Sequence, residues 1–239
     1  MRNLFSEIAG VYDRMNRLLS LGMDRRWRRL AAVGATVRPA RALDVACGTG
    51  DFSFELARRF EDAEVLGVDL SPKMLDVARR KNSSPRVVFA EGDAMCLAGI
   101  PDRSFQLCSC AFGFRNFADR RQALREIARV LASDGELIVL EFFRPRSSAL
   151  WLAVSAWIRL AASLFARGKA SAYRHLRESV RQMDTEEEFR SMAEEAGLFP
   201  CSRRRFFPCC TCLYLVSDNA AKARRTAWCA KQSSAELTE

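Results

Sequence analysis

The stretch Leu43-Asp44-Val45-Ala46-Cys47-Gly48-Thr49-Gly50-Asp51 decides the fold. Its first four residues predict a short, mostly apolar strand over 42–46. Two glycines then form a turn, and a helical pattern follows as far as Phe60. Glycine lets the backbone approach a ligand closely and adopt dihedral angles that other residues avoid. A strand, a glycine turn and a helix in this order predict the first unit of an α/β fold, with a ligand at the turn.

The pattern continues on the carboxyl side of this unit. Strands are expected over 64–68, 87–90, 105–111 and 137–142, and helices over 71–81 and 119–131 lie between them. A capping box at Thr185 and Glu188 begins another helix, which ends before Gly197. A strand pair over 205–207 and 211–216 closes the sheet. The sequence therefore predicts a mostly parallel, seven-stranded sheet with helices on both faces.

Helices outside the sheet are expected over 3–20, 24–34, 149–166 and 170–182. The third of these is apolar nearly all round, but its 18 residues span only about 27 Å. Arg159 near its middle would be costly in a bilayer. A buried or membrane-surface helix is therefore expected here, not a spanning one.

The charge of the chain is segregated. The 239 residues contain 38 Lys or Arg and 29 Asp or Glu, a net charge of +9. Residues 1–42 carry a net +6 and residues 144–181 a net +7, whereas the remainder carries −4. Segregated basic segments favour an anionic partner, either phospholipid or nucleic acid, although solvated helix faces would give the same count.

Cysteine usage indicates neither disulfides nor metal. The nine cysteines are an odd number, no apolar leader precedes them, and no C-x-x-C pair occurs. His175 is the single histidine, so the sequence predicts no metal site. A reducing, cytoplasmic location is the expectation.

The glycine turn does not match a dinucleotide fingerprint, because Ser53 occupies the place of the third glycine. No Walker lysine follows it either. Asp69 ends the second strand, where a carboxylate can accept both hydroxyls of a ribose. Asp93 and Ala94 follow the third strand. The set resembles the cofactor motifs of class I S-adenosylmethionine-dependent methyltransferases, which have a Rossmann-like fold. The resemblance implies that S-adenosylmethionine binds to Asp44, Gly48, Thr49, Gly50, Asp69, Asp93 and Ala94.

Further motifs are more specific. They are Tyr12-Asp13-Arg14-Met15-Asn16 with Trp27, Ala111-Phe112-Gly113-Phe114-Arg115-Asn116, Leu140-Glu141-Phe142, and the run from Tyr173 to Val180. Together they resemble the menaquinone/ubiquinone biosynthesis C-methyltransferase family, from about Phe5 to Val216. The chain departs from the family pattern at Asp24, where His is usual, at Phe143, where Ser is usual, and at His175, where Tyr is usual.

This resemblance implies a prenylated quinol as methyl acceptor, either demethylmenaquinol or a polyprenyl-benzoquinol. A quinol ring carbon attacks well only once a hydroxyl has lost its proton, so the site must stabilise an anion and accept a proton. Arg115 is the candidate anion stabiliser, because its guanidinium stays charged and cannot be the base. Asn116 would orient the same oxygen, Tyr12 would close the pocket or relay a proton, and Asp13 is an acid/base candidate. Phe112, Trp151 and Trp157 are candidate substrate contacts.

The expected organisation is one methyltransferase domain over 1–217, followed by a flexible polar tail over 218–239. Within the domain, 1–40 would form a helical lid and 144–182 a helical substrate-binding insertion. The apolar helix of the insertion would line a channel for the prenyl tail, touch the surface of an anionic membrane, or form a homodimer face. Alternatives are a methyltransferase acting on another lipid or small aromatic molecule, or on RNA. RNA is disfavoured because no RNA-binding appendage is visible, and an NAD-dependent oxidoreductase is disfavoured by Ser53.

Overall fold

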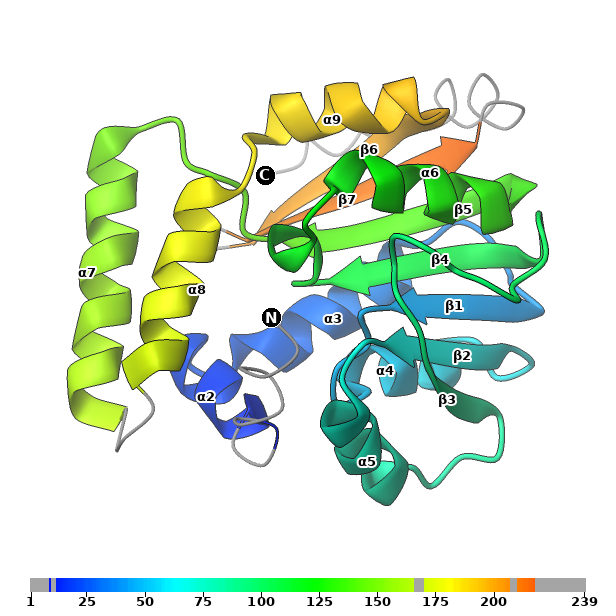
Figure 1. The fold of residues 1–239 in the computed structure, drawn as a ribbon, viewed down its shortest axis with the longest axis horizontal. Helices are drawn as coiled ribbons and strands as arrows, with labels where there is room; N and C mark the ends of the chain where they lie inside the picture. Colours follow the sequence, from blue (N-terminus) through cyan, green and yellow to red (C-terminus); the bar gives the residue numbers. More distant parts are fainter. Residues whose placement is uncertain (1–8, 10–11, 166–169, 207–209, 218–239) are drawn as a thin grey trace, which may run out of the picture.

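A seven-stranded mixed sheet is the centre of the fold (Figure 1). The computed structural model describes residues 9, 12–165, 170–206 and 210–217. The strand order is β3-β2-β1-β4-β5-β7-β6. The strands are β1 Arg41–Val45, β2 Glu64–Asp69, β3 Val87–Glu91, β4 Phe105–Ala111, β5 Leu131–Glu141, β6 Leu198–Phe206 and β7 Cys210–Ser217. The first five pair in parallel, and β7 is antiparallel to both β5 and β6.

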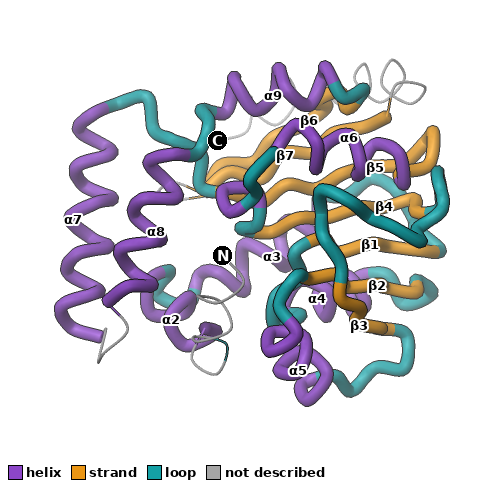
Figure 2. The backbone as a smooth tube through the Cα atoms, in the orientation of Figure 1, coloured by secondary structure: helices purple, strands orange, loops and turns teal. Residues whose placement is uncertain are grey.

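Helices cover both faces of this sheet, which forms the middle layer in Figure 2. On the near face of Figure 1 lie α6 (Arg120–Val130) and α9 (Glu186–Glu195), and behind the sheet lie α3 (Met23–Gly34) and α4 (Asp51–Arg59). Beside the lower strands lies α5 (Pro72–Lys81). A separate helical group, α2 (Tyr12–Leu19), α7 (Ser148–Phe165) and α8 (Ala170–Gln182), stands at the end of the sheet where β4 and β5 finish.

Each face of the sheet has its own apolar core. On one face Trp27 of α3 and Leu56 of α4 are buried, and on the other Ile127 of α6 and Phe189 of α9 are buried. A third, smaller cluster joins the helical group to α5 through buried side chains of α2, α7 and α8; its members include Met15, Met74, Ile158 and Tyr173. Burial of this kind of apolar area is the main favourable term in folding. The third cluster fixes the helical group against the sheet.

The fold predicted from the sequence is confirmed, with two differences in strand length. The predicted strand at 137–142 begins earlier, at Leu131, because a shift in pairing between Phe105 and Leu107 lets the turn before it join the sheet. The strand predicted at 205–207 begins at Leu198. Three consecutive exposed arginines, at 203–205, interrupt the apolar pattern that predicts a strand. An edge strand tolerates them because it pairs with a neighbour on one side only. The capping box at Thr185 is present. Most of the helix predicted before Tyr12 and the tail over 218–239 lie outside the described residues.

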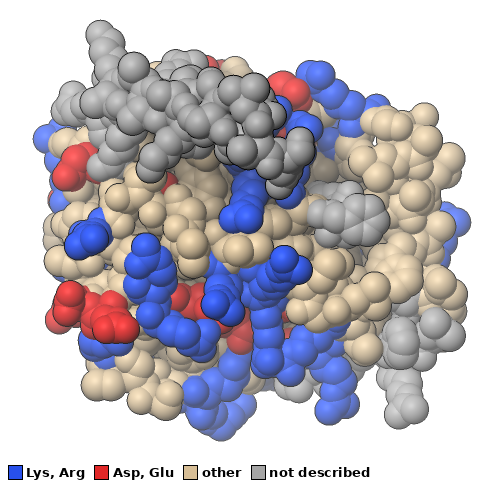
Figure 3. Space-filling model, turned by 180° about the vertical axis from the view of Figure 1, so that it is seen from behind, with Lys and Arg blue, Asp and Glu red and all other residues tan. Residues whose placement is uncertain are grey.

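The basic side chains gather in a central band on the face opposite to the view of Figure 1 (Figure 3). Helix α3 lies on this side of the sheet and exposes Arg25, Arg26 and Arg29. Arg28 of the same helix is an exception, because its side chain is buried. Much of the positive charge of residues 1–42 therefore faces solvent.

No helix within the described residues is long and apolar enough to cross a membrane. Over the same ranges, no group of three His, Cys, Asp or Glu side chains is arranged to hold a metal ion.

Candidate active site

The glycine turn between β1 and α4 is a tight loop of left-handed backbone. Ala46, Gly48 and Gly50 have φ angles of 54°, 56° and 83°. A Cβ on Gly50 would lie 2.7 Å from the Phe89 ring, so only glycine fits there without a shift. The turn brings backbone N–H groups to the carboxyl edge of the sheet, where open α/β sheets bind their ligands.

Asp69 at the end of β2 is hydrogen-bonded to this turn. Its Oδ2 accepts from the Gly48 N–H at 2.8 Å, and its Oδ1 accepts from the Ser71 N–H at 2.9 Å. Burial raises the pKa of this carboxyl, and the backbone hydrogen bonds oppose that shift. The carboxylate is thus held in place from both sides at the edge of the cavity described below.

Asp44 lies beneath the turn and is 1% exposed. Its two oxygens accept hydrogen bonds from Ser53 at 2.6 Å and from Ser109 at 2.7 Å. Burial raises its pKa to about 6, although both serines and the charge of Arg28 act in the opposite direction. Ser53, which replaces the third glycine of a dinucleotide site, therefore has a role of its own as a partner of Asp44.

A cavity of about 270 Å³ opens over this edge of the sheet. Of the residues predicted to bind the cofactor, Gly48, Asp69, Asp93 and Ala94 line it. Asp44, Gly48 and Thr49 line a smaller pocket beside it, together with Arg28. Tyr12 of α2 lines both. The structure thus brings together the acids and backbone that the sequence singled out, and Gly50 shapes the turn between them.

A second cavity, of about 70 Å³, lies between the sheet and the helical group. Its wall is mainly apolar, with Trp157 and Ile158 of α7 and Leu176 and Val180 of α8. Its polar lining includes Arg115, Asp24 and Arg28. Phe112 lines both this cavity and the larger one, so the two spaces meet at its ring.

Phe112 is held in an uncommon conformation to form this wall. Its φ is 60°, a left-handed value that bulky residues rarely adopt. Its ring stacks on Phe142 at a centroid distance of 5.0 Å, and the guanidinium groups of Arg28 and Arg115 lie 5.2 Å and 5.7 Å from its centroid. Strain of this kind tends to occur at functional sites.

Arg115 lies three residues after Phe112, within the short 3-10 helix Phe114–Asn116, and is 8% exposed. Its Nη1 donates to Glu141 Oε1 at 2.7 Å, and Glu141 is completely buried at the end of β5. Burial lowers the pKa of Arg115, but the charge and hydrogen bond of Glu141, together with Tyr12 and Cys110, outweigh it and leave the pKa above its ordinary value. The guanidinium is therefore a fixed positive charge on the second cavity. The sequence does not reveal this role of Glu141, since nothing in its spacing pairs it with Arg115.

Asn116 lines the larger cavity. Its Nδ2 donates to the Phe112 carbonyl at 3.3 Å, and its Oδ1 lies 3.1 Å from Nε2 of His175 on α8. The sequence pattern marked His175 only as a departure from a family motif. Its contact with Asn116 spans 59 positions and has no local signal.

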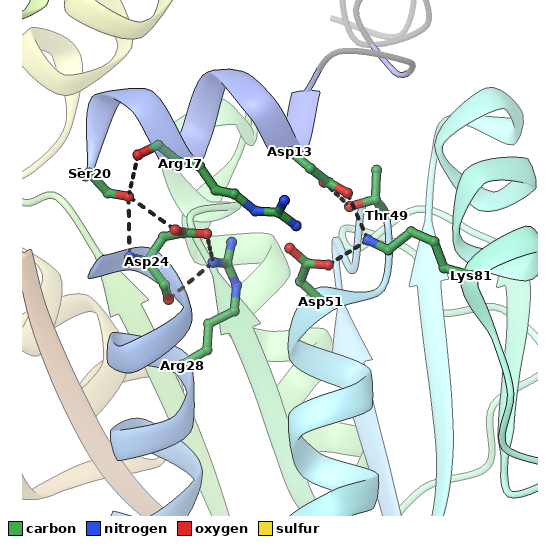
Figure 4. Close-up of polar contacts among 8 residues, drawn as sticks. All are labelled: Asp13, Arg17, Ser20, Asp24, Arg28, Thr49, Asp51 and Lys81. Carbon is green, nitrogen blue, oxygen red and sulfur yellow. Dashed lines mark hydrogen bonds and ion pairs between the residues drawn. The ribbon is translucent and has the colours of Figure 1, made fainter. Parts of the chain in front are cut away.

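Asp13 lies in an ion-pair cluster that joins α2 to the glycine turn (Figure 4). It accepts from Thr49 Oγ1 at 2.5 Å and pairs with Lys81 at 2.8 Å, and Lys81 also pairs with Asp51. A second cluster in Figure 4 joins Ser20, Asp24 and Arg28, with Arg17 between the two. The contacts of Asp13 are those of a tether between the N-terminal helix and the cofactor turn.

The two tryptophans predicted to contact substrate differ in position. Trp157 lines the second cavity, and its Nε1 donates to the Leu19 carbonyl at 2.9 Å. Trp151 is half-buried one to two turns earlier on α7. Its contact with substrate stays a prediction.

A sheet of this order, with a glycine turn after β1 and acids at the ends of β2 and β3, defines a class I S-adenosylmethionine-dependent methyltransferase. Comparison with known proteins agrees. Residues 1–214 match the model of the ubiE/COQ5 methyltransferase family, and the chain belongs to this family.

Its relatives include enzymes of named activity. A demethylmenaquinone methyltransferase of Deinococcus radiodurans is 43% identical, over 82% of this chain and 84% of its own. One from Thermus thermophilus is 44% identical, over 81% and 90%. A ubiquinone/menaquinone biosynthesis C-methyltransferase of Hahella chejuensis is 38% identical, over 83% of each.

Solved structures show the fold alone. A methyltransferase in complex with the Haloferax volcanii Trm112 activator has a TM-score of 0.68 at 19% identity, covering 90% of this chain and 96% of its own. An S-adenosylmethionine-dependent methyltransferase of Thermotoga maritima has a TM-score of 0.65 at 18% identity, covering 91% and 100%.

Proposed function

We propose that this enzyme methylates a ring carbon of demethylmenaquinol to give menaquinol, with a polyprenyl-benzoquinol as the alternative acceptor. The observation that carries the proposal is the second cavity, which has an apolar wall, a buried arginine, and a border with the cofactor cavity at Phe112. An aromatic wall of Phe112, Phe142 and Trp27 suits a flat ring. Relatives of both names support the family of acceptors.

The larger cavity fits S-adenosylmethionine. Asp69 would accept the ribose hydroxyls, Asp93 and Ala94 would contact the adenine, and the glycine turn would hold the methionine end. Arg28, next to Thr49 in the smaller pocket, suits the carboxylate of that end. The charge of Asp44 lies beneath it and favours a cationic group above. When bound, the cofactor supplies an electrophilic methyl group on a sulfonium.

The residues at the border of the cavities act on the quinol. Arg115 stabilises the negative charge that forms on the quinol oxygen, and Phe112 keeps the ring in line with the methyl group. The bound cofactor would supply its methyl group to the ring carbon and leave as S-adenosylhomocysteine. The proton of the quinol hydroxyl and the proton of the ring carbon would both pass to water. Asn116 lines the cofactor cavity, and its amide would reach the quinol oxygen where that cavity borders the second one at Phe112. Tyr12 covers the cofactor cavity from α2.

Label transfer tests this proposal. The protein is incubated with methyl-labelled S-adenosylmethionine and each reduced quinone precursor, and the label is expected on the naphthoquinol ring. Arg115→Ala should abolish turnover and leave cofactor affinity unchanged, whereas Asp69→Ala should weaken cofactor binding. Label on neither ring would refute the quinol assignment, and label on the benzoquinol alone would replace the naphthoquinol.

We also propose that the protein binds to the anionic inner face of the cytoplasmic membrane. The exposed face of α7 supports this proposal. Leu152 is 68% exposed and Leu160 is 50% exposed, and Arg146 and Arg159 lie close in sequence. Apolar side chains with basic neighbours suit an interfacial helix. Vesicles with anionic lipid should retain the protein at low salt. Leu152→Ser with Leu160→Ser should weaken retention, and Val88→Ser, on the distant edge strand β3, should not. Equal retention of all three proteins would refute the contact.

A further inference from the structure

Two contacts fix the orientation of the Asn116 side chain. The role that we infer from them below rests on the proposed quinol methylation. On one side Nδ2 donates to the Phe112 carbonyl at 3.3 Å. On the other side Oδ1 lies 3.1 Å from Nε2 of His175. A carbonyl accepts only, so the amide nitrogen must face Phe112 and the amide oxygen must face the imidazole. His175 must then donate from Nε2.

These contacts decide which group Asn116 can offer to a ligand. Its oxygen is engaged by His175, and one of its two N–H groups is engaged by Phe112. The second N–H remains for the cavity that Asn116 lines. A donor at this place stabilises a quinol oxygen as it becomes negative, whereas an amide oxygen there would repel it.

We propose that His175 is a positioning residue, which holds the Asn116 amide so that its N–H, and not its oxygen, faces the quinol oxygen where the two cavities meet at Phe112. The placement of α8 makes this contact, because α8 packs against the short helix that carries Arg115 and Asn116. Without a donor at position 175, a single hydrogen bond of 3.3 Å, to the Phe112 carbonyl, would hold the amide, and its orientation would be less firmly fixed.

The charge state of His175 agrees with a neutral donor. Burial lowers the pKa of the imidazole, and the neighbouring Arg115 charge lowers it further, against a smaller effect of Glu178. A neutral imidazole carries one proton, and the contact with Asn116 places that proton on Nε2. The same contact therefore sets the tautomer of His175 and the orientation of Asn116.

A matched pair of variants separates this role from packing. In His175→Gln the amide nitrogen can reach the place of Nε2 and keep the donor, whereas in His175→Asn it reaches only the place of Nδ1. We expect His175→Gln to retain kcat within about twofold and His175→Asn to lose about three- to tenfold, as for one hydrogen bond. The KM for S-adenosylmethionine and the Tm should be alike in the two variants. Equal kcat values in the two variants would refute the proposal.

Two further measurements are independent of that comparison. In an Asn116→Ala background, His175→Asn should cause no further loss of kcat, and a full additional loss would show that His175 acts by another route. Because the chain contains a single histidine, ¹⁵N NMR of labelled imidazole reads its tautomer without any turnover. Protonation at Nε2 is expected, and protonation at Nδ1 would overturn the assignment. Absence of quinol turnover in the wild-type protein would instead refute the proposed function and leave the NMR result standing.

Discussion

The ion pair between Arg115 and Glu141 should be the most sensitive electrostatic contact in the protein when one partner is removed. The side chains are 7% and 0% exposed, and their closest atoms are 2.7 Å apart. Glu141 also accepts from the backbone N–H groups of Arg115 and Phe142. Glu141→Gln keeps the shape of the side chain and removes its charge, so it leaves a buried guanidinium without a counter-ion.

The expected cost follows from the burial of the pair. Removing one partner of a buried ion pair destabilises a protein by about 3–5 kcal/mol, because the remaining charge is desolvated and unpaired. A chain of this length loses about 2–4 °C of Tm per kcal/mol. Glu141→Gln should therefore lower the Tm by about 6–20 °C and lower turnover as well, since Arg115 is no longer held in place.

A double variant separates the structural effect from the chemical one. Replacing both partners by apolar residues, as in Arg115→Met with Glu141→Leu, often costs little stability. Thermal unfolding should show the double variant closer to the wild type than Glu141→Gln is, while quinol methylation stays abolished. A Tm shift below about 2 °C for Glu141→Gln, or additive losses in the double variant, would contradict the buried pair on which the role of Arg115 depends.

Three further predictions concern the cofactor side. Asp69→Asn should weaken S-adenosylmethionine binding about 10- to 100-fold, as for loss of a charged hydrogen-bond acceptor. Titration calorimetry measures this affinity, and Asp76→Asn on the outer side of α5 is the control. Unchanged affinity in Asp69→Asn would remove Asp69 from the site. The pKa of Asp44 is raised from 3.8 to about 6, so the folded state binds its proton more tightly than the unfolded state does. Its contribution to stability should therefore fall by about 3 kcal/mol as the pH rises from about 4 to 6. Urea unfolding should show that Asp44→Asn lacks this fall. Parallel curves of unfolding free energy against pH for the variant and the wild type would refute the prediction. Lys81→Met should speed deuterium exchange in α2 about fivefold, as for a partly exposed ion pair, whereas Lys73→Met on the same helix should not; equal exchange would show that the tether does not hold α2.

The sequence predicts the sheet and the cofactor edge well because both have local signals. Alternating apolar strands and helices predict a mostly parallel sheet with helices on both faces. The positions after strand ends place Asp69 and Asp93 at one edge, since parallel strands all finish on the same side. The turn at Gly50 has its own signal, because few residues other than glycine adopt its φ of 83°.

The interior of the site is not predictable in this way. The partners of Arg115 and Asp44 lie 26 and 65 positions away, at Glu141 and Ser109. Such contacts depend on the register of neighbouring strands, and no periodicity in either strand reveals which polar residue of one meets which of the other. The sequence therefore indicates Arg115 as a charge for an anion, but it does not reveal that the buried Glu141 holds it.

The distribution of charge about Phe112 explains why the enzyme needs two cavities that meet at one ring. A sulfonium is stabilised by negative charge and a quinolate by positive charge, so the two requirements oppose each other if they share one space. In this structure Asp44, Asp69 and Asp93 line the cofactor side, whereas Arg115 lines the quinol side. Asp24 also lines the quinol side, but it is paired with Arg28. Phe112 lies between the two sides, and its ring faces the two guanidinium groups of Arg28 and Arg115. An apolar wall there separates the carboxylates of the cofactor side from Arg115 on the quinol side. The strained φ of Phe112 is then the structural cost of placing an aromatic ring at the one point where both cavities end.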